Sequence, residues 1–362
     1  MSSPPTITPT SSPTAPADAP ARRDLLAVGE LFLDVLYGPL ERAPRLGEEL
    51  HTDRAALVPG GIANFARAAA ALGARTAVAA PVGDGDAATA LVRAQLQAEG
   101  IAVDALQVRP GWALPITSAI AYDGDRALIT GGADRTGAHR ITPDTRGADA
   151  VAVHLHLEDM PWLAGTEGRV FADVGWDPTG RWDRAILRHL EHCFAMLPNA
   201  EEAQAYTRTD TPEQAVRALA ELVPVAVVTL GARGALGIDA RTGAQVHVEA
   251  LDLGPADATG AGDTLGAALI VGFSLGWELP AALELATLAA TARAAGVAGP
   301  GRIPALPQLA ELARAHDLPL VDRLDEVLRK DPRSETTPAT SDTCTSDRST
   351  PAPAHHLSGD LS

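Results

Sequence analysis

The 362-residue chain contains only two cysteines, Cys193 and Cys344. They cannot build a disulfide framework or a cysteine-based zinc site, and such a composition favours a reducing compartment such as the cytoplasm. Aromatic residues make up only 4% of the chain, although hydrophobic residues reach 46%. The core is therefore expected to consist mainly of alanine, leucine and valine.

Positive charge is also scarce, because 29 lysines and arginines face 46 acidic residues and leave a net charge of −17. Nucleic acids and anionic membrane surfaces bind clusters of lysine and arginine, so neither is an expected partner. No apolar run reaches the roughly 18 residues that a membrane span needs. The first 23 residues also lack the hydrophobic centre of a signal peptide. We therefore expect no export, no membrane anchor and a cytoplasmic location.

Two common nucleotide-binding motifs are missing from the sequence. The chain has no Gly-x-x-x-x-Gly-Lys-Ser/Thr loop, which excludes the ordinary P-loop mode of phosphate binding. Residues 29–38 also lack the Gly-x-Gly-x-x-Gly that a dinucleotide-dependent oxidoreductase would carry after its first strand. Any nucleotide site in this protein must therefore use another loop.

Both ends of the chain have low sequence complexity. Residues 1–22 consist mainly of Ser, Pro, Thr and Ala, and residues 329–362 are again polar. Such segments bury too little apolar surface to offset the entropy lost on ordering, so both are predicted to be disordered tails. Residues 23–328 are long enough for one large α/β domain.

Within this domain, short apolar segments alternate with helical patterns. Strands are expected at 24–37, 75–83, 149–157, 169–175, 193–198 and 225–230. This alternation predicts a doubly wound, mostly parallel sheet flanked by helices. Two segments, 38–58 and 112–130, break the rhythm, and the second contains a hairpin turn pattern at 123–125. They are predicted to form a small β lid.

Two histidines, His154 and His156, lie on one predicted strand, and their spacing puts their side chains on the same face. Such a pair could bind a metal ion, but no third ligand follows at a suitable spacing. We therefore interpret both as ordinary strand histidines with hydrogen-bonding partners inside the fold.

The most informative segment is a glycine-rich turn, Asp257-Ala258-Thr259-Gly260-Ala261-Gly262-Asp263-Thr264, that leads into an apolar, alanine-rich helix. The first amides of a helix have no acceptor inside the helix and form an anion site. A carboxylate in that site is costly unless the site brings a phosphate and a proton acceptor together. Asp263 could otherwise be an acid that simply favours a first helical turn. We favour phosphoryl transfer.

Three segments complete the pattern in order: Leu197-Pro198-Asn199-Ala200-Glu201-Glu202, Thr229-Leu230-Gly231-Ala232-Arg233-Gly234, and the glycine-rich turn. Together they resemble the ribokinase-like (PfkB-type) carbohydrate kinase family over roughly residues 24–315. The resemblance implies a ribokinase-like α/β fold and ATP-dependent phosphorylation of a primary hydroxyl of a sugar or sugar derivative. It also implies Mg²⁺, a monovalent cation such as K⁺, and a homodimer formed through the lid.

By this resemblance Asp263 is the general base. The amides of Gly260, Ala261 and Gly262 would hold the charge that develops on the γ-phosphate. Asp257 and Thr259 would bind the monovalent cation.

The resemblance also assigns the nucleotide side of the site. Asn199 would contact the nucleotide, and Glu202 would organise Mg²⁺ through water, as suits a small hard cation. The same pair could form a helix capping box, and both roles are compatible. Further nucleotide contacts are implied for Thr229, Gly231, Gly234 and Gly296.

On the acceptor side, Asp34 matches a strand-end aspartate that binds sugar hydroxyls. Gly60, Gly61 and Asn64 resemble the family's Gly-Gly and Asn substrate loop, and Arg126 lies in a segment similar to its lid strand. Only two residues separate Gly61 from Asn64, where the common form has three, and the lysine that ribokinases proper carry in this loop is missing.

These departures leave the acceptor open. A nucleoside kinase of the same fold is one alternative, with Trp112, Tyr122 and Trp176 as candidates to stack on a base. A sugar or nucleotide sensor without catalytic activity is another, because a fold does not fix a function.

Overall fold

The computed structural model describes residues 21–38, 40–122, 125–132, 141–177, 179–254, 258–299 and 301–330. Its main element is an eight-stranded sheet in the order β14-β13-β12-β11-β10-β9-β1-β4. Neighbouring strands from β4 to β12 run parallel, and β13 and β14 are antiparallel additions. The strands are β1 (Arg23–Val28), β4 (Thr76–Ala79), β9 (Ala148–His154), β10 (Arg169–Asp173), β11 (Ala195–Met196), β12 (Val225–Thr229), β13 (Ala235–Asp239) and β14 (Ala244–Val248).

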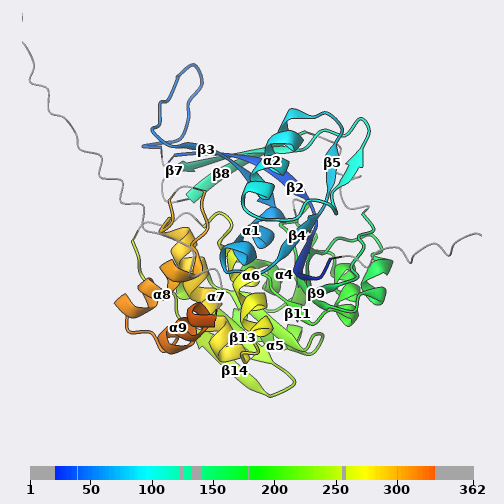
Figure 1. Ribbon diagram of the computed structural model, residues 1–362, viewed down its shortest axis with the longest axis vertical. Helices are drawn as coiled ribbons and strands as arrows, with labels where there is room; N and C mark the ends of the chain where they lie inside the picture. Colours follow the sequence, from blue (N-terminus) through cyan, green and yellow to red (C-terminus); the bar gives the residue numbers. More distant parts are fainter. Residues whose placement is uncertain are drawn as a thin grey trace, which may run out of the picture.

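A second sheet has four strands in the order β3-β2-β7-β8, here called the lid sheet. Its strands are β2 (Leu31–Tyr37), β3 (Ala55–Gly61), β7 (Ile116–Tyr122) and β8 (Asp125–Gly131). It lies at the end of the molecule opposite β13 and β14 (Figure 1). The antiparallel pairing of β7 with β8 agrees with the expected hairpin, although turn residues 123–124 lie outside the described part. Strands β5 (Pro81–Gly83) and β6 (Gln107–Arg109) form a separate two-stranded sheet.

The segment 24–37, expected as one strand, forms two strands in two different sheets. β1 lies in the main sheet, and the chain bends at Gly29-Glu30 before β2 enters the lid sheet. β2 pairs there with β3 and β7. Because β1 and β2 are both largely apolar, the hydrophobic pattern continues through the bend and does not reveal it.

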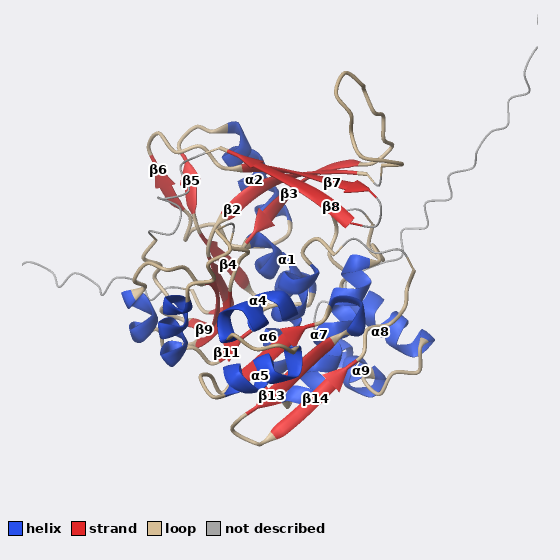
Figure 2. Ribbon diagram, turned by 180° about the vertical axis from the view of Figure 1, so that it is seen from behind, coloured by secondary structure: helices blue, strands red, loops and turns tan. Residues whose placement is uncertain are grey.

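Helices cover both faces of the main sheet, as a doubly wound fold requires (Figure 2). They are α1 (Ala63–Ala71), α2 (Ala87–Ala98), α4 (Ala200–Thr207), α5 (Pro212–Ala220), α6 (Ala261–Ser274), α7 (Leu279–Ala294), α8 (Leu306–Ala315) and α9 (Val321–Lys330). The 3₁₀ helices are η1 (Pro161–Gly165), η2 (Arg184–His192) and η3 (Gly231–Arg233). None of the described helices is both long enough and apolar enough to cross a bilayer.

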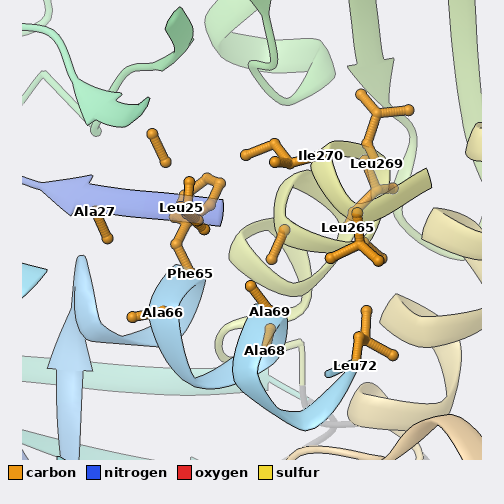
Figure 3. Close-up of a cluster of buried hydrophobic side chains, with 14 of the residues drawn as sticks. Leu25, Ala27, Phe65, Ala66, Ala68, Ala69, Leu72, Leu265, Leu269 and Ile270 are labelled. Carbon is orange, nitrogen blue, oxygen red and sulfur yellow. The ribbon is translucent and has the colours of Figure 1, made fainter. Parts of the chain in front are cut away.

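The packing of α1 against α6 positions the site described below. Phe65 of α1 is 1% exposed and lies among Leu25, Leu265 and Ile270 (Figure 3). A Cβ on Gly266 of α6 would lie only 2.5 Å from the Phe65 ring, so the two helices meet where α6 has no side chain. This close approach brings the first turns of both helices together.

Candidate active site

The carboxylate of Asp263 lies where the first turns of α1 and α6 meet. Asn64, in the first turn of α1, donates from Nδ2 to Oδ2 of Asp263 at 3.1 Å. Asn64 is buried and Asp263 is half-buried. The structure thus joins a predicted acceptor-binding residue to the predicted base across 199 residues of sequence.

Asp34 belongs to the same group of residues. It lies on β2, opposite Val58 of β3, and a Cβ on Gly60 would lie 1.9 Å from its Oδ2. Only glycine therefore fits at position 60 with Asp34 in this orientation. Burial, together with the negative charge of Asp263, raises the pKa of Asp34 to about 6. A hydrogen bond from an acceptor hydroxyl would stabilise this buried carboxyl group.

The amides at the start of α6, which are predicted to form an anion site, differ in their hydrogen bonding. Gly260 precedes the helix with a φ of 71°, a left-handed conformation that suits glycine. The helical hydrogen bonds begin with Thr264 N–H donating to Gly260 O, so the amides of Gly262 and Asp263 have no acceptor inside the helix. The Ala261 N–H instead donates to Ala258 O at 3.1 Å. Gly262 is exposed and therefore accessible to a ligand.

Asn199 and Glu202 form the capping box of α4. The Asn199 side chain accepts from Glu202 N–H at 2.9 Å, and Oε2 of Glu202 accepts from Asn199 N–H at 3.1 Å. This pairing uses one oxygen of each side chain and leaves the second oxygen of Glu202 for other contacts. Burial raises the pKa of Glu202 to about 7. Asn199 also pairs with Thr229 at the end of β12, which places two predicted nucleotide-side residues together.

A histidine that the sequence interpretation treated as an ordinary strand residue reaches the same site. Nε2 of His154, the last residue of β9, lies 3.7 Å from Oδ1 of Asp263. Donor atoms of His154, Asp173 and Asp263 all lie within 4.8 Å of one another. The spacing of these residues along the sequence did not reveal this group. The ends of the predicted strands could have revealed part of it, because parallel strands end at one edge of a sheet, and β9 ends with His154 and β10 with Asp173.

Negative charge accumulates around these residues. Burial and the nearby Glu202 raise the pKa of Asp173 well above its usual value. Burial opposes protonation of His154, but the contact with Asp263 and the charges of Asp173 and Glu30 outweigh it and raise the pKa of His154. The group therefore attracts cations and protons.

The other predicted site residues lie on surrounding elements. Arg126 is on β8 and, by the register of β2, β7 and β8, on the same face of the lid sheet as Asp34. Gly231 is the first residue of η3, just after β12, and Gly234 follows η3, while Gly296 follows α7, where it is exposed. Gly61 ends β3, and Thr259 lies just before α6. Asp257 lies outside the described residues.

Residues 22–297 match the family described as pfkB family carbohydrate kinase, which is most of the chain. The chain belongs to this family. The expected family and the expected ribokinase-like α/β fold are therefore confirmed.

Curated relatives of this pfkB-family kinase are distant. The ribokinase of Bacillus subtilis (strain 168) is 24% identical over 312 residues, which cover 80% of this chain and 99% of that protein. The bifunctional protein HldE of Nitrobacter hamburgensis is 30% identical over 322 residues, covering 80% of this chain but 63% of the relative. HldE of Bradyrhizobium diazoefficiens is 27% identical, covering 78% of this chain and 62% of the relative. The chain thus spans less than two thirds of the length of the HldE proteins.

Solved structures share its fold. An Arabidopsis thaliana ribokinase complexed with ribose and ATP superposes with a TM-score of 0.65 at 23% identity, covering 80% of this chain and 98% of that one. The ribokinase of Thermotoga maritima gives a TM-score of 0.66 at 20% identity, covering 81% of this chain and 99% of the other. An E. coli structure of the same fold, solved with ATP and Mg²⁺, gives 0.66 at 20% identity, covering 82% and 99%.

The pfkB-family kinase also has a cavity of about 240 Å³ beside the site. It is lined by the ends of β1 and β9, by the segment that follows β10 and by the 3₁₀ helices η1 and η2, and His154 and Glu30 belong to its wall. Trp162, Trp176 and Tyr206 supply aromatic surface, and Trp176 is 60% exposed. The cavity therefore offers apolar as well as charged contacts next to the predicted base.

Proposed function

We propose that this protein phosphorylates a primary hydroxyl of a sugar or sugar derivative with ATP, with Asp263 as general base. The observation that carries the proposal is the meeting of Asp34, Asn64 and Asp263 beside the amide-rich start of α6. Acceptor-binding groups, a base and an anion site together are what phosphoryl transfer to an alcohol requires.

Each residue has a defined task in this proposal. Asn64 holds Oδ2 of Asp263, which aims the carboxylate at the acceptor. Asp34 and Arg126, on one face of the lid sheet, bind acceptor hydroxyls. Asp263 takes the proton of the reacting hydroxyl, while the N–H groups of Gly262 and Asp263 donate to developing negative charge. Closure of the lid sheet would exclude water and disfavour hydrolysis.

The residues present fit ATP and Mg²⁺ in two respects. The 14-residue helix α6 presents unpaired amides at its exposed N-terminus, which suits a phosphate. Glu202 and Asp173 are buried acids with raised pKa values, and a divalent cation nearby would balance their charge. Asn199, Thr229, Gly231, Gly234 and Gly296 are the proposed nucleotide contacts, and Thr259 with Asp257 the proposed K⁺ ligands. When bound, ATP supplies the phosphoryl group and Mg²⁺ neutralises its charge.

The test is ATP consumption over a panel of sugars, sugar acids and nucleosides, with wild type and Asp263→Asn. We expect acceptor-dependent turnover that the substitution lowers by about 10²- to 10⁴-fold, while ATP binding measured by calorimetry persists. Wild-type protein that binds ATP and sugars without turning either over would instead indicate a sensor.

A nucleoside is the second candidate acceptor, supported by the aromatic wall of the cavity beside His154. Trp162, Trp176 and Tyr206 could contact a flat base, and Asp34 could bind the ribosyl hydroxyls. Higher kcat/KM for nucleosides than for any free sugar, lowered by Trp176→Ala, would establish this acceptor class.

A further inference from the structure

Asp263, the predicted base in the first turn of α6, lies close to His154, which comes from strand β9. His154 and Asp173 are register partners on the parallel strands β9 and β10, so their side chains leave the sheet on the same face. This is the face covered by α1 and α6, because Ala150 and Ala152 on the same side of β9 belong to the core cluster that contains Phe65 and Leu265. The carboxyl end of β9 therefore places the imidazole of His154 next to Asp263.

Asn64 and His154 approach different oxygens of the Asp263 carboxylate. Asn64 Nδ2 donates to Oδ2 at 3.1 Å, and His154 Nε2 lies 3.7 Å from Oδ1. We propose that His154 is a positioning residue of this kinase, which fixes the orientation of the Asp263 carboxylate together with Asn64 and, as an imidazolium, balances the surrounding acids. The proposal rests on the proposed role of Asp263 as the base.

The position of the imidazole is itself fixed by packing. The ring of Phe65 lies edge-on to His154, with ring centroids 6.0 Å apart and an interplanar angle of 68°. A Cβ on Gly29 would lie 3.2 Å from Nδ1, so the backbone after β1 lies close to the ring as well. Because the His154 ring is held by these neighbours, it can fix the orientation of the Asp263 carboxylate.

Charged groups face His154 from every element around it except α1. Glu30 lies between β1 and β2, Asp173 ends β10, Glu202 belongs to α4 and Asp263 to α6. From α1 come the uncharged side chains of Phe65 and Asn64. Lysine cannot supply the balancing charge, because Lys330 is the only lysine of the chain and lies at the end of α9. These acids raise the pKa of His154 although burial opposes this, so they favour the protonated form of the imidazole.

The first experiment does not depend on turnover. The imidazole nitrogens of His154 are titrated by NMR in the wild type and in Asp263→Asn. Loss of the negative charge is expected to lower the pKa of His154. His156, whose Nδ1 lies 3.0 Å from Glu158, is the internal control and should titrate unchanged. An unchanged titration of His154 would overturn the proposal whatever the protein phosphorylates.

The second experiment compares His154→Leu, His154→Gln and the matched control His156→Gln. We expect the leucine variant to lose about 10²-fold in kcat with little change in acceptor KM, because misorientation of a base mainly affects the chemical step. Glutamine keeps an N–H donor without the charge and should restore part of kcat. The wild-type kcat should also decline at alkaline pH as the imidazolium loses its proton, and this decline should be absent in His154→Gln.

These outcomes separate the inference from the proposed function. A positioning role would be contradicted if the His154 variants had the same kcat as the wild type, or if the substitutions changed only KM. So would a tightly bound metal ion, found by elemental analysis of the wild type and lost in His154→Leu, since His154 would then be a ligand. If no acceptor is turned over but the titration of His154 still depends on Asp263, the proposed function fails and the pairing stands.

Discussion

At the scale of single residues, the site holds more carboxyl groups than its surroundings easily accommodate. Asp34, Asp173 and Glu202 all have raised pKa values, and burial is the first cause for each. Buried ionised acids destabilise a folded protein unless a cation or hydrogen bonds balance them. We infer that these groups are kept for binding at a cost in stability.

The destabilising effect of a buried acid can be measured at Asp34. Its pKa of about 6 in the folded protein lies above the ordinary value of 3.8, so the folded state binds the proton more tightly than the unfolded state does. The stability contributed by this group therefore falls as the pH rises from about 4 to about 6 and stays low above that. Asp34→Asn should raise the free energy of unfolding at pH 8 by about 1–3 kcal/mol and change it little near pH 4. Urea unfolding at both pH values checks this.

Asp24→Asn is the control with the opposite sign. The Arg75 side chain, which donates hydrogen bonds from Nε to Asp24, holds the pKa of that carboxyl below its usual value, so removing the charge should lower stability at pH 8. An Asp34→Asn variant as stable as the wild type at pH 8 would show that the ionised carboxylate is not destabilising.

At the scale of elements, the distance between α1 and α6 controls the contact between Asn64 and Asp263. The two helices approach closely because Gly266 leaves room for the Phe65 ring. Each helix carries one partner of the hydrogen bond in its first turn. A change in this packing should therefore alter the site without touching it.

Gly266→Ala tests this coupling. The new methyl group would lie 2.5 Å from the Phe65 ring, so the helices must separate, and overpacking of this kind costs about 1–3 kcal/mol. We expect a lower midpoint in urea unfolding together with reduced kcat. The double variant Phe65→Leu/Gly266→Ala should be more stable than the two single effects predict, because the smaller side chain relieves the clash. Strict additivity would contradict the proposed contact.

At the scale of the whole molecule, the lid sheet has two different faces. The face with Asp34 and Arg126 is turned to the site, whereas the register places Tyr37, Leu57, Ile116 and Ile129 on the opposite face. These four side chains are 40%, 46%, 42% and 63% exposed, respectively. Exposed apolar patches of this kind often mark interaction surfaces.

The family resemblance predicts a homodimer formed through the lid, and from the exposed apolar side chains we infer that a second copy of the chain covers this outer face. Light scattering coupled to size exclusion should then give twice the chain mass of 37.3 kDa for the wild type. Ile129→Asp should shift the protein towards the monomer, because a charge would be buried in the interface. Leu275→Asp, at a 41% exposed position after α6, is the matched control and should leave the mass unchanged. A monomeric wild type would refute the lid dimer.

Much of the fold could be predicted because its evidence is local in sequence. Apolar segments alternating with helical patterns indicated the doubly wound sheet, and the glycine-rich turn indicated the start of an apolar helix, observed as α6. Asn199 and Glu202 lie three residues apart, so their capping box could be anticipated as well. Each of these features depends on residues that are neighbours along the chain.

The tertiary structure alone decided which distant residues meet. Whether β1 and β2 belong to one strand depends on pairing with strands β4, β9, β3 and β7, which no hydrophobic pattern encodes. Likewise, His154 is an ordinary strand histidine by sequence, and only the parallel pairing of β9 with β10 and the packing of α6 place it beside Asp173 and Asp263. The sequence by itself thus determined the family and the layers and predicted Asp263 as the base, while the residues that surround Asp263 were set by contacts between segments far apart in the chain.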